Sequence, residues 1–260
     1  MRVATWNVNS LAARLPRLVE WLGQAAPDVV CLQETKVPHD AFPAAELTAA
    51  GYESVDLSEG RWNGVAVLSR VGIADVAHGL EGDPGFPDPQ TIEARTLAAT
   101  CGPVRVRAVY VPNGRTPEDP HYQYKLAWLA ALREVVAAEG GGALPYAVMG
   151  DFNVAPTDED VWDPAAFVGS THVTPPERAV LADLREHGFT DVRPRIAKGN
   201  PYTYWDYRAG AFHKGWGMRI DLVYANAAFA GAVTDAWVDR EARKGKLPSD
   251  HAPVVVDLDL

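Results

Sequence analysis

The sequence predicts one α/β domain that spans residues 1–260. Two patterns indicate this class: short apolar or alternating runs rich in β-branched residues recur along the chain, and segments with helical spacing lie between some of them. The size supports a single unit, because 260 residues with 47% hydrophobic content can bury one large core. No repeat of fixed period and no linker divides the chain, so we expect one domain rather than two.

At least seven runs are typical of strands, since they are short and separated by turn residues. In chain order they are RVATWNVN, DVVCLQE, GVAVLSR, RTLAATCGPVRVRAVYVPN, YAVMGDFN, RIDLVYAN and APVVVDLDL. The turn CGP separates two alternating arms within the fourth run, which predicts a β-hairpin and therefore antiparallel pairing.

Apolar residues recur at three- and four-residue spacing in three segments, which predicts helices that cover sheet faces. The segments lie around Leu15–Leu22, Leu126–Val136 and Val180–Leu184. Residues 139–145, EGGGALP, are typical of a flexible helix-to-strand connection. Residues 154–176 form a long, proline-rich polar loop, and loops of that length in a compact domain are usually functional or partly disordered.

Composition excludes several classes of protein. The two cysteines, Cys31 and Cys101, give neither a disulfide framework nor a zinc-type spacing. The first strand begins at the N-terminus without a long apolar segment before it, and no later run approaches the roughly 20 apolar residues that a membrane span needs. We therefore expect a soluble, cytoplasmic protein that does not bind membranes.

The formal net charge of −10 argues against a strongly basic surface that coats nucleic acid without regard to sequence. It does not exclude an enzyme that acts on phosphates. Carboxylates gathered around a divalent cation would themselves make the total acidic, while a local basic stripe could still dock the substrate.

Polar side chains able to bind metal or phosphate stand at one strand end after another. They are Asn7 and Asn9, Gln33 and Glu34, Tyr110 and Asn113, Asp151 and Asn153, Asp221, and then Asp250 and His251 before the last strand. Each has an ordinary alternative, such as a surface carboxylate, a capped turn or the turn PSD beside an exposed histidine. If all these ends meet on one rim, however, the rim is an active site.

Asp221 is the hardest of these residues to explain as structural. Its neighbours Ile220 and Leu222 are apolar and are expected to be buried, and an ionised carboxylate in such a place needs a partner. His251 is the natural partner, because a carboxylate that holds one imidazole nitrogen fixes the tautomer and favours the charged ring.

Several motifs give the chain a resemblance to a known family. In order from residue 3 to residue 256 they are WNVNSLAAR, PDVVCLQETK, GVAVLSR, YVPNG, GDFNVAP, MRIDLVYA and PSDHAPV. Together they resemble the exonuclease III family of abasic-site endonucleases, within the endonuclease/exonuclease/phosphatase superfamily. The resemblance implies a four-layered α/β sandwich, with two mixed sheets packed face to face and helices outside. It also implies a magnesium-dependent DNA repair phosphodiesterase with abasic-site endonuclease, 3′-to-5′ exonuclease and 3′-phosphatase activities, whose proportions the sequence does not rank.

The predicted cation is Mg²⁺, with Mn²⁺ as the other candidate. Glu34 and the side-chain oxygen of Asn7 are hard ligands that suit Mg²⁺ rather than zinc. The resemblance adds Asp250 as an auxiliary ligand. Many abasic endonucleases have Asp where this chain has Asn9, so Asn9 is expected to be a neutral neighbour and Glu34 the principal carboxylate ligand.

The same resemblance assigns catalytic roles. Hydrolysis of a phosphodiester needs a positioned water, a base or metal to deprotonate it, and positive charge on the phosphoryl oxygens. Asp151 would activate or orient the water, with Asn153 beside it. His251, held by Asp221, would donate to a non-bridging oxygen, and Tyr110 would lie near the scissile phosphate.

Residues 200–221 place aromatic side chains among the cations Arg208, Lys214 and Arg219, a mixture that suits a platform against a distorted duplex. The alternative is a loop that folds on its own aromatics. The resemblance implies a deoxyribose pocket formed by Tyr204, Trp205, Met218 and Ile220.

A second group of cations lies in DREARKGK, residues 239–246, which could equally be a solvated surface. Its position just before His251 favours phosphate contact. With the segments GRWNG and NGRT, the predicted DNA contacts are Arg61, Trp62, Asn63, Asn113, Arg115, Tyr204, Trp205, Trp216, Met218, Arg243, Lys244 and Lys246.

The expected partner is double-stranded DNA with abasic sites or 3′ ends, bound by a monomer. Two alternatives stay open. One is a phosphatase or phospholipid phosphodiesterase of the same superfamily, which the charged residues of 202–216 disfavour. The other is a DNA-binding relative without catalysis, which would require gaps in a set of site residues that is complete here.

Overall fold

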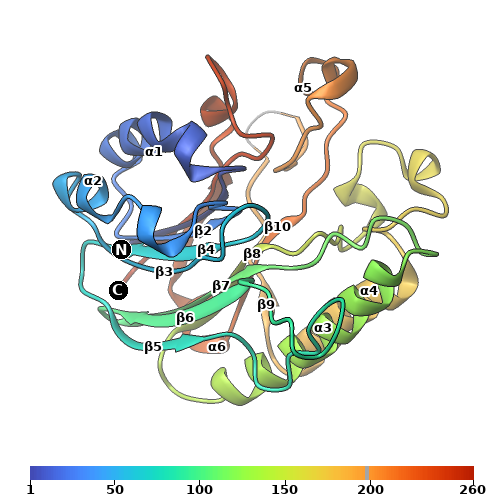
Figure 1. The fold of residues 1–260 in the computed structure, drawn as a ribbon, viewed down its shortest axis with the longest axis horizontal. Helices are drawn as coiled ribbons and strands as arrows, with labels where there is room; N and C mark the ends of the chain where they lie inside the picture. The colour runs from blue at the N-terminus through green and yellow to red at the C-terminus, as the bar shows by residue number, and fades with distance from the viewer. Residues whose placement is uncertain (197–198) are drawn as a thin grey trace.

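Two six-stranded mixed β-sheets pack face to face in the computed structural model, which describes residues 1–196 and 199–260. Helices cover the outer face of each sheet, so the layers run helix, sheet, sheet, helix (Figure 1). The predicted α/β sandwich of two packed mixed sheets is confirmed.

The first sheet has the strand order β11-β12-β1-β2-β4-β3. Its strands are β1 (Arg2–Asn7), β2 (Val29–Gln33), β3 (Glu53–Leu57), β4 (Val65–Ser69), β11 (Val233–Val238) and β12 (Val254–Leu258). β1 and β2 are parallel, whereas β1 and β12 are antiparallel. This pairing brings the two ends of the chain together: the Met1 amino group donates to the carbonyl of Leu258 at 2.7 Å.

The second sheet has the order β5-β6-β7-β8-β10-β9. Its strands are β5 (Ala74–His78), β6 (Thr96–Cys101), β7 (Val104–Tyr110), β8 (Tyr146–Asp151), β9 (Thr190–Asp191) and β10 (Asp221–Ala225). β6 and β7 form the predicted antiparallel hairpin, and its turn contains Gly102 with φ of 56°, a left-handed conformation that glycine adopts at low cost. β7 and β8 are parallel.

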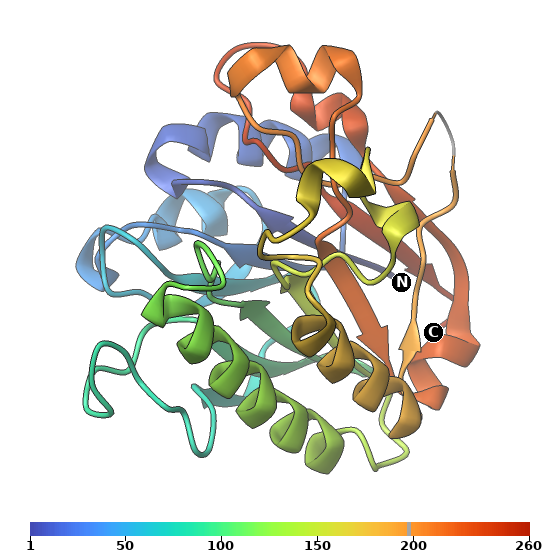
Figure 2. The same cartoon turned by 90° about the vertical axis from the view of Figure 1, so that its right-hand side faces the viewer.

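Four helices pack on the outer faces of the two sheets. α1 (Leu11–Ala25) and α2 (Ala44–Ala49) pack on the first sheet, and α3 (Pro120–Glu139) and α4 (Pro175–Glu186) pack on the second (Figures 1 and 2). The three segments predicted as helices correspond to α1, α3 and α4. Shorter helical segments are α5 (Ala211–Lys214), α6 (Ala227–Ala232), η1 (His39–Ala41), η2 (Asp158–Asp160), η3 (Pro164–Phe167), η4 (Arg208–Gly210) and η5 (Arg240–Arg243).

The main core lies between the two sheets and is built from inward-facing residues of both, such as Val67, Val106, Met149 and Val256. Cys31 and Cys101 belong to this core and are free thiols. Because every central strand is buried on both faces, the sheets form a rigid support for the loops at their ends.

The loop 154–176 is held against the second sheet by buried charges. Asp160 in this loop accepts from the fully buried Arg219, which also pairs with Asp191, with N–O distances of 2.8 Å to each carboxylate. Arg219, predicted as one of the cations among the aromatic residues, therefore packs inside the protein and does not face a duplex.

Across the described ranges 1–196 and 199–260, no helix is both long enough and apolar enough to cross a membrane.

Candidate active site

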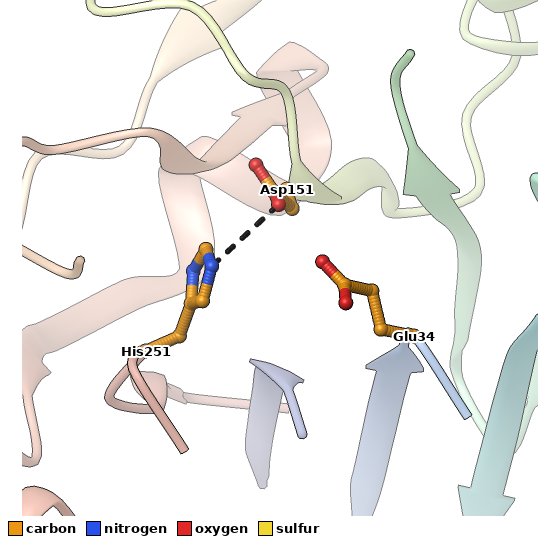
Figure 3. A group of neighbouring side chains, drawn as sticks. All are labelled: Glu34, Asp151 and His251. Carbon is orange, nitrogen blue, oxygen red and sulfur yellow. Dashed lines mark ion pairs between the residues drawn. The ribbon is translucent and has the colours of Figure 1, made fainter. Parts of the chain in front are cut away.

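The predicted meeting of strand ends occurs on one rim, formed by the carboxyl ends of β1, β2, β7 and β8 and the start of β10 and β12. One detail differs from the sequence expectation: Asp221 begins its strand rather than ending it. Since β10 is antiparallel to β8, this still places Asp221 directly opposite Asp151 in the register. Figure 3 shows Glu34, Asp151 and His251 converging on this rim from three separate segments.

These three side chains, called the trio below, bring two carboxylate oxygens and an imidazole nitrogen within 4.8 Å of one another. Asn7 links two of them: its Nδ2 donates to Glu34 Oε1 at 2.8 Å and to Asp151 Oδ2 at 2.9 Å. Its Oδ1 accepts from the backbone N–H of Asn9 at 3.0 Å. The amide nitrogen, not the predicted oxygen ligand, therefore faces the carboxylates.

Asp151 is buried at the end of β8. Burial and the charges of Asp221 and Glu34 raise the pKa of Asp151 to about 7, although the nearby His251 charge acts in the opposite direction. The backbone N–H of Asn153 donates to Asp151 Oδ1 at 2.9 Å and fixes the carboxylate. A carboxylate with a pKa near neutrality can exchange a proton with water at physiological pH.

Glu34 has a different electrostatic environment. Burial tends to raise the pKa of Glu34, but Lys36 and the Asn7 amide outweigh it and hold that pKa below its usual value. Lys36 Nζ lies 2.5 Å from Glu34 Oε2 and donates to Asn9 Oδ1 at 2.8 Å. Lys36 is not among the predicted site residues, although it stands two positions after Glu34 in the LQETK motif that carries the resemblance.

Backbone strain accompanies these positions. Glu34, Lys36 and Asn153 have φ values of 53°, 51° and 50°, in the left-handed region that non-glycine residues seldom adopt. Strained residues concentrate at functional sites, where the surrounding structure compensates for their cost.

His251 is held in the predicted way. Its Nδ1 lies 2.8 Å from Asp221 Oδ2, and its Nε2 lies 3.8 Å from Asp151 Oδ2. Burial favours the neutral ring, but Asp221 and Asp151 raise the pKa of His251 to about 10. The ring is therefore an imidazolium at neutral pH and can donate from Nε2.

Tyr110 completes this part of the rim. Burial, together with the Glu34 and Asp151 charges, raises the pKa of Tyr110 well above its usual value, so its hydroxyl stays protonated. Arg95 lies over the Tyr110 ring at 4.9 Å and donates to the Tyr110 carbonyl. Sequence reasoning missed Arg95, which lies at the start of a strand-like run and carries no motif.

Asp250, the predicted auxiliary ligand, does not belong to the trio. It accepts from Asn9 Nδ2 at 3.0 Å and lies close to the hydroxyl of Ser249. These contacts direct its carboxylate toward the loop beside β1 and not toward Glu34 and Asp151.

A cavity of about 500 Å³ opens beside His251 and is lined by three segments that are far apart in the sequence. Tyr204, Trp216 and Met218, all predicted substrate contacts, line it from the 200–221 segment, and Asn113 and Arg115 line it from the β7–α3 connection. The Tyr204 and His251 rings are 4.9 Å apart.

The loop 154–176 adds Trp162 and His172 to this lining, and the sequence singled out neither of them. Trp162 stacks on Trp216 at 4.8 Å, and Lys214, one of the predicted cations, lies 4.1 Å from the Trp216 ring. His172 Nδ1 donates to the carbonyl of Asn153 at 2.5 Å, and burial together with the Lys125 charge lowers the pKa of His172 to about 4. The length of the loop 154–176 was the one signal that could have indicated them.

Of the four predicted DNA contacts that are buried, Met218 lines the cavity, whereas the other three do not, which corrects those three assignments. Trp205 is 1% exposed and packs edge-on against Phe212. Asn63 donates to Glu59 and Glu93, and Arg243 donates to the Trp205 carbonyl. Each side chain supports a loop from within and is not available to a duplex in this conformation.

The remaining predicted cations and the nearby Trp62 do reach solvent. Trp62 is 69% exposed with Arg61 over its ring at 5.3 Å, and Arg115 and Lys246 are also exposed. Lys244 is exposed as well and pairs with Glu241 at 2.8 Å. Of these residues, Arg115 lines the cavity beside His251.

Two arginines of α1 donate hydrogen bonds to the backbone of the segment before His251. Neither was predicted as a site residue. Arg17 donates to the carbonyls of Ala242, Lys244 and Lys246. Arg14 donates to the carbonyls of Asn9 and Pro248.

Comparison with known proteins places this site in context. Residues 4–251 match the sequence model of the Endonuclease/Exonuclease/phosphatase family. The curated exodeoxyribonuclease III of Haemophilus influenzae is 27% identical over 266 residues, with 98% of each chain covered. The 3′ phosphatase NExo from Neisseria, solved bound to a product DNA hairpin, is 39% identical with a TM-score of 0.92. An AP endonuclease from Archaeoglobus fulgidus is 34% identical, also with a TM-score of 0.92. Both structural comparisons cover 100% of each chain.

Proposed function

This chain belongs to the endonuclease/exonuclease/phosphatase family, and from that premise we propose that it is a Mg²⁺-dependent DNA repair phosphodiesterase of the exodeoxyribonuclease III type. Its substrates are double-stranded DNA with abasic sites or 3′ ends, which it processes as an abasic-site endonuclease, a 3′-to-5′ exonuclease and a 3′-phosphatase. The observation that carries this proposal is the trio of Glu34, Asp151 and His251 beside a cavity lined by aromatic and basic residues.

The donor set fits a hard divalent cation. Glu34 and Asp151 direct carboxylate oxygens at one another, and their mutual repulsion contributes to the raised pKa of Asp151. A divalent cation would neutralise this excess negative charge, and carboxylate oxygens are the ligands that Mg²⁺ and Mn²⁺ prefer. When bound there, the ion would supply positive charge to the phosphoryl oxygens.

The protein's own groups then have complementary tasks. Asp151, fixed by Asn153, orients the attacking water and accepts its proton as the water oxygen bonds to phosphorus. His251, kept cationic by Asp221, donates from Nε2 to a non-bridging phosphoryl oxygen and offsets the negative charge there as the water oxygen bonds to phosphorus. The electron pair of the breaking P–O bond departs on the leaving-group oxygen, which takes a proton from solvent. Tyr110, which stays protonated, offers a second donor on the same rim.

The rival functions are less well supported by the same residues. A phospholipid phosphodiesterase needs an apolar surface beside its site, whereas the cavity wall here includes Arg115, Asp206 and Arg208. A relative without catalysis would lack part of the trio, and all of its positions carry side chains suited to catalysis.

We propose that residues 1–260 act as one domain, as a monomer. The two buried free thiols suit the reducing cytoplasm, which is the compartment we propose.

A direct test compares three duplexes, which carry an abasic-site analogue, a blunt 3′ end or a 3′-phosphate, each with and without Mg²⁺. We expect Mg²⁺-dependent hydrolysis of at least one of them. Hydrolysis of none, combined with release of phosphate from a lipid or small-molecule ester, would favour the rival phosphatase function.

Tyr204→Ala is expected to reduce incision at abasic sites by at least tenfold more than removal of a 3′-phosphate from a nicked duplex. Tyr204 lines the cavity next to His251, and shape selection by a cavity matters most where no strand end guides binding. The measurement is the ratio of kcat/KM for the two substrates, taken on one preparation so that any loss of folded protein cancels.

Tyr207→Ala is the matched control for Tyr204→Ala. Tyr207 belongs to the same segment and is 49% exposed, but it does not line this cavity. Its replacement should leave the ratio of the two activities within about twofold, the precision we expect of such a ratio. Equal losses on both substrates in Tyr204→Ala would argue against a specialised pocket.

A further inference from the structure

Lys125 of α3 and Glu177 of α4 form an ion pair in which both side chains are fully buried. The Lys125 ammonium lies 2.5 Å from Glu177 Oε1, and it also donates to the carbonyls of Asn113 at 3.1 Å and Asn153 at 2.7 Å. The hydroxyl of Thr171 lies 3.2 Å from the same ammonium. Lys125 therefore contacts two loops that converge on the rim, the β7–α3 connection at Asn113 and the β8–α4 connection at Asn153 and Thr171.

Glu177 is equally well satisfied. Its Oε1 accepts from the Thr171 hydroxyl and the His172 backbone N–H, and its Oε2 accepts from the backbone and hydroxyl of Thr174. Burial opposes ionisation, but Lys125 and these donors lower the pKa of Glu177 to about 2. The carboxylate is therefore charged at neutral pH and can balance the Lys125 ammonium.

The loops that meet at Lys125 are those that carry site residues. Asn113 Nδ2 donates to Asn153 Oδ1 at 3.2 Å, and the Asn153 N–H holds Asp151. The loop after Asn113 runs so close to Lys125 that a Cβ on Gly114 would lie 3.0 Å from Lys125 Cδ, and Gly114 has φ of 89°. A glycine is needed there, which shows how tightly this loop is fitted to the lysine stem.

We propose that Lys125 is a positioning residue, whose buried ammonium sets the loops of Asn113, Asn153 and Thr171 relative to Asp151, with Glu177 as its counter-charge. This inference rests on the proposed phosphodiesterase function for its effect on rate. Lys125 touches no reacting atom and acts through the backbone carbonyls that it binds.

Energetics separate this role from simple stabilisation. Desolvation makes a buried ion pair a weak source of stability, and a pair of apolar side chains of similar volume often stabilises a fold as well or better. An apolar pair cannot, however, donate hydrogen bonds to the Asn113 and Asn153 carbonyls. What the ammonium adds beyond packing is the relative placement of the loops.

The test uses Lys125→Met, Glu177→Leu and the double variant Lys125→Met/Glu177→Leu. Each single variant leaves a buried charge without its partner and should melt at a lower temperature than the parent. The double variant should recover most of the Tm, yet kcat should stay roughly tenfold to a hundredfold below the parent with KM within about threefold, as expected for misplaced catalytic groups. A merely structural pair would instead regain kcat as Tm recovers.

Arg107 and Glu139 supply the matched control. They form another largely shielded ion pair, joining β7 to the end of α3 away from the rim, with an N–O distance of 2.6 Å. Arg107→Met/Glu139→Leu should keep kcat within about twofold of the parent even if Tm falls. Should the Lys125→Met/Glu177→Leu protein not accumulate, Lys125→Gln/Glu177→Gln removes the same charges with smaller changes in volume.

Amide hydrogen exchange distinguishes failure of the positioning role from failure of the proposed phosphodiesterase function. Faster exchange at the backbone N–H groups of Asn153 and Arg115 in the double variant is expected, because both belong to the loops that Lys125 holds. Parental kcat and parental exchange in the double variant would overturn the positioning role. Inactivity of the parent on every duplex, with faster loop exchange in the double variant, would reject the proposed function and leave the positioning role standing.

Discussion

Replacing Glu34 with glutamine is expected to lower the rate of DNA cleavage by about three orders of magnitude or more, because a catalytic cation contributes several kcal/mol to the transition state. The substitution removes one of the two carboxylates that can hold the ion and keeps nearly the same shape. Asn7 Nδ2 can still donate to the side-chain oxygen at position 34, and Lys36 keeps its bond to Asn9. The fold should therefore survive.

Two measurements check this expectation. Single-turnover cleavage over a range of Mg²⁺ concentrations should show a large loss that added Mg²⁺ restores only in part, and calorimetry with Mn²⁺ should show weaker binding. Asp250→Asn is the matched control, since Asp250 is a carboxylate on the same rim but outside the trio. It should cost no more than about tenfold, and near-normal cleavage by Glu34→Gln at limiting Mg²⁺ would remove Glu34 from the site.

The strands that the sequence predicted differ from the strands that it missed in how much of their surface is buried. Every predicted run became a central strand, whereas β3, β5, β9 and β11 are the four outer strands of the two sheets and were all missed. A central strand is buried on both faces and needs a continuous apolar run. An outer strand such as Ala74–His78 is largely exposed, so its composition gives little signal.

Sequence patterns located the site for a related reason. A polar residue after a buried strand is anomalous unless it acts at the sheet edge, and this argument led to Glu34, Asp151 and Asp221. What the patterns could not show is what packs over a loop. Trp205 and Arg243 lie in segments that appear accessible by composition, yet contacts between the two segments bury both side chains.

The buried ion pair of Lys125 and Glu177 could not be predicted from local sequence patterns either. Lys125 lies within an amphipathic helix, where a lysine is normally exposed, and its partner Glu177 is 52 residues away. Only the tertiary structure shows that the β7–α3 and β8–α4 connections meet at this pair.

The second large effect concerns Asp221 and His251. If Asp221 orients and charges His251, and His251 stabilises charge on the phosphoryl group, the two act as one unit. Removal of a positioned charged donor costs on the order of 3 kcal/mol, or about a hundredfold in rate. Asp221→Asn, His251→Asn and the double variant should therefore each lose roughly the same amount in single-turnover cleavage, with duplex affinity changed much less.

A control cycle pairs Asp221→Asn with Tyr110→Phe. Tyr110 stands on β7 and is held by Arg95 rather than by Asp221, so the losses in this cycle should multiply. Multiplication in the Asp221–His251 cycle as well would mean that these two residues work independently. The PSD turn would then need no catalytic explanation.

The pH dependence gives a second test of the same pair. With a raised pKa of about 10, His251 is charged throughout the neutral range and loses its proton only as the pH rises through that value. Asp221 is the strongest influence that raises this pKa against burial, so its removal should bring the pKa down. The residual activity of Asp221→Asn should therefore decline as the pH rises from 6 to 9 relative to that of the parent. A constant ratio of the two rates over this interval would show that Asp221 does not keep His251 charged, and its contribution would then be one of orientation alone.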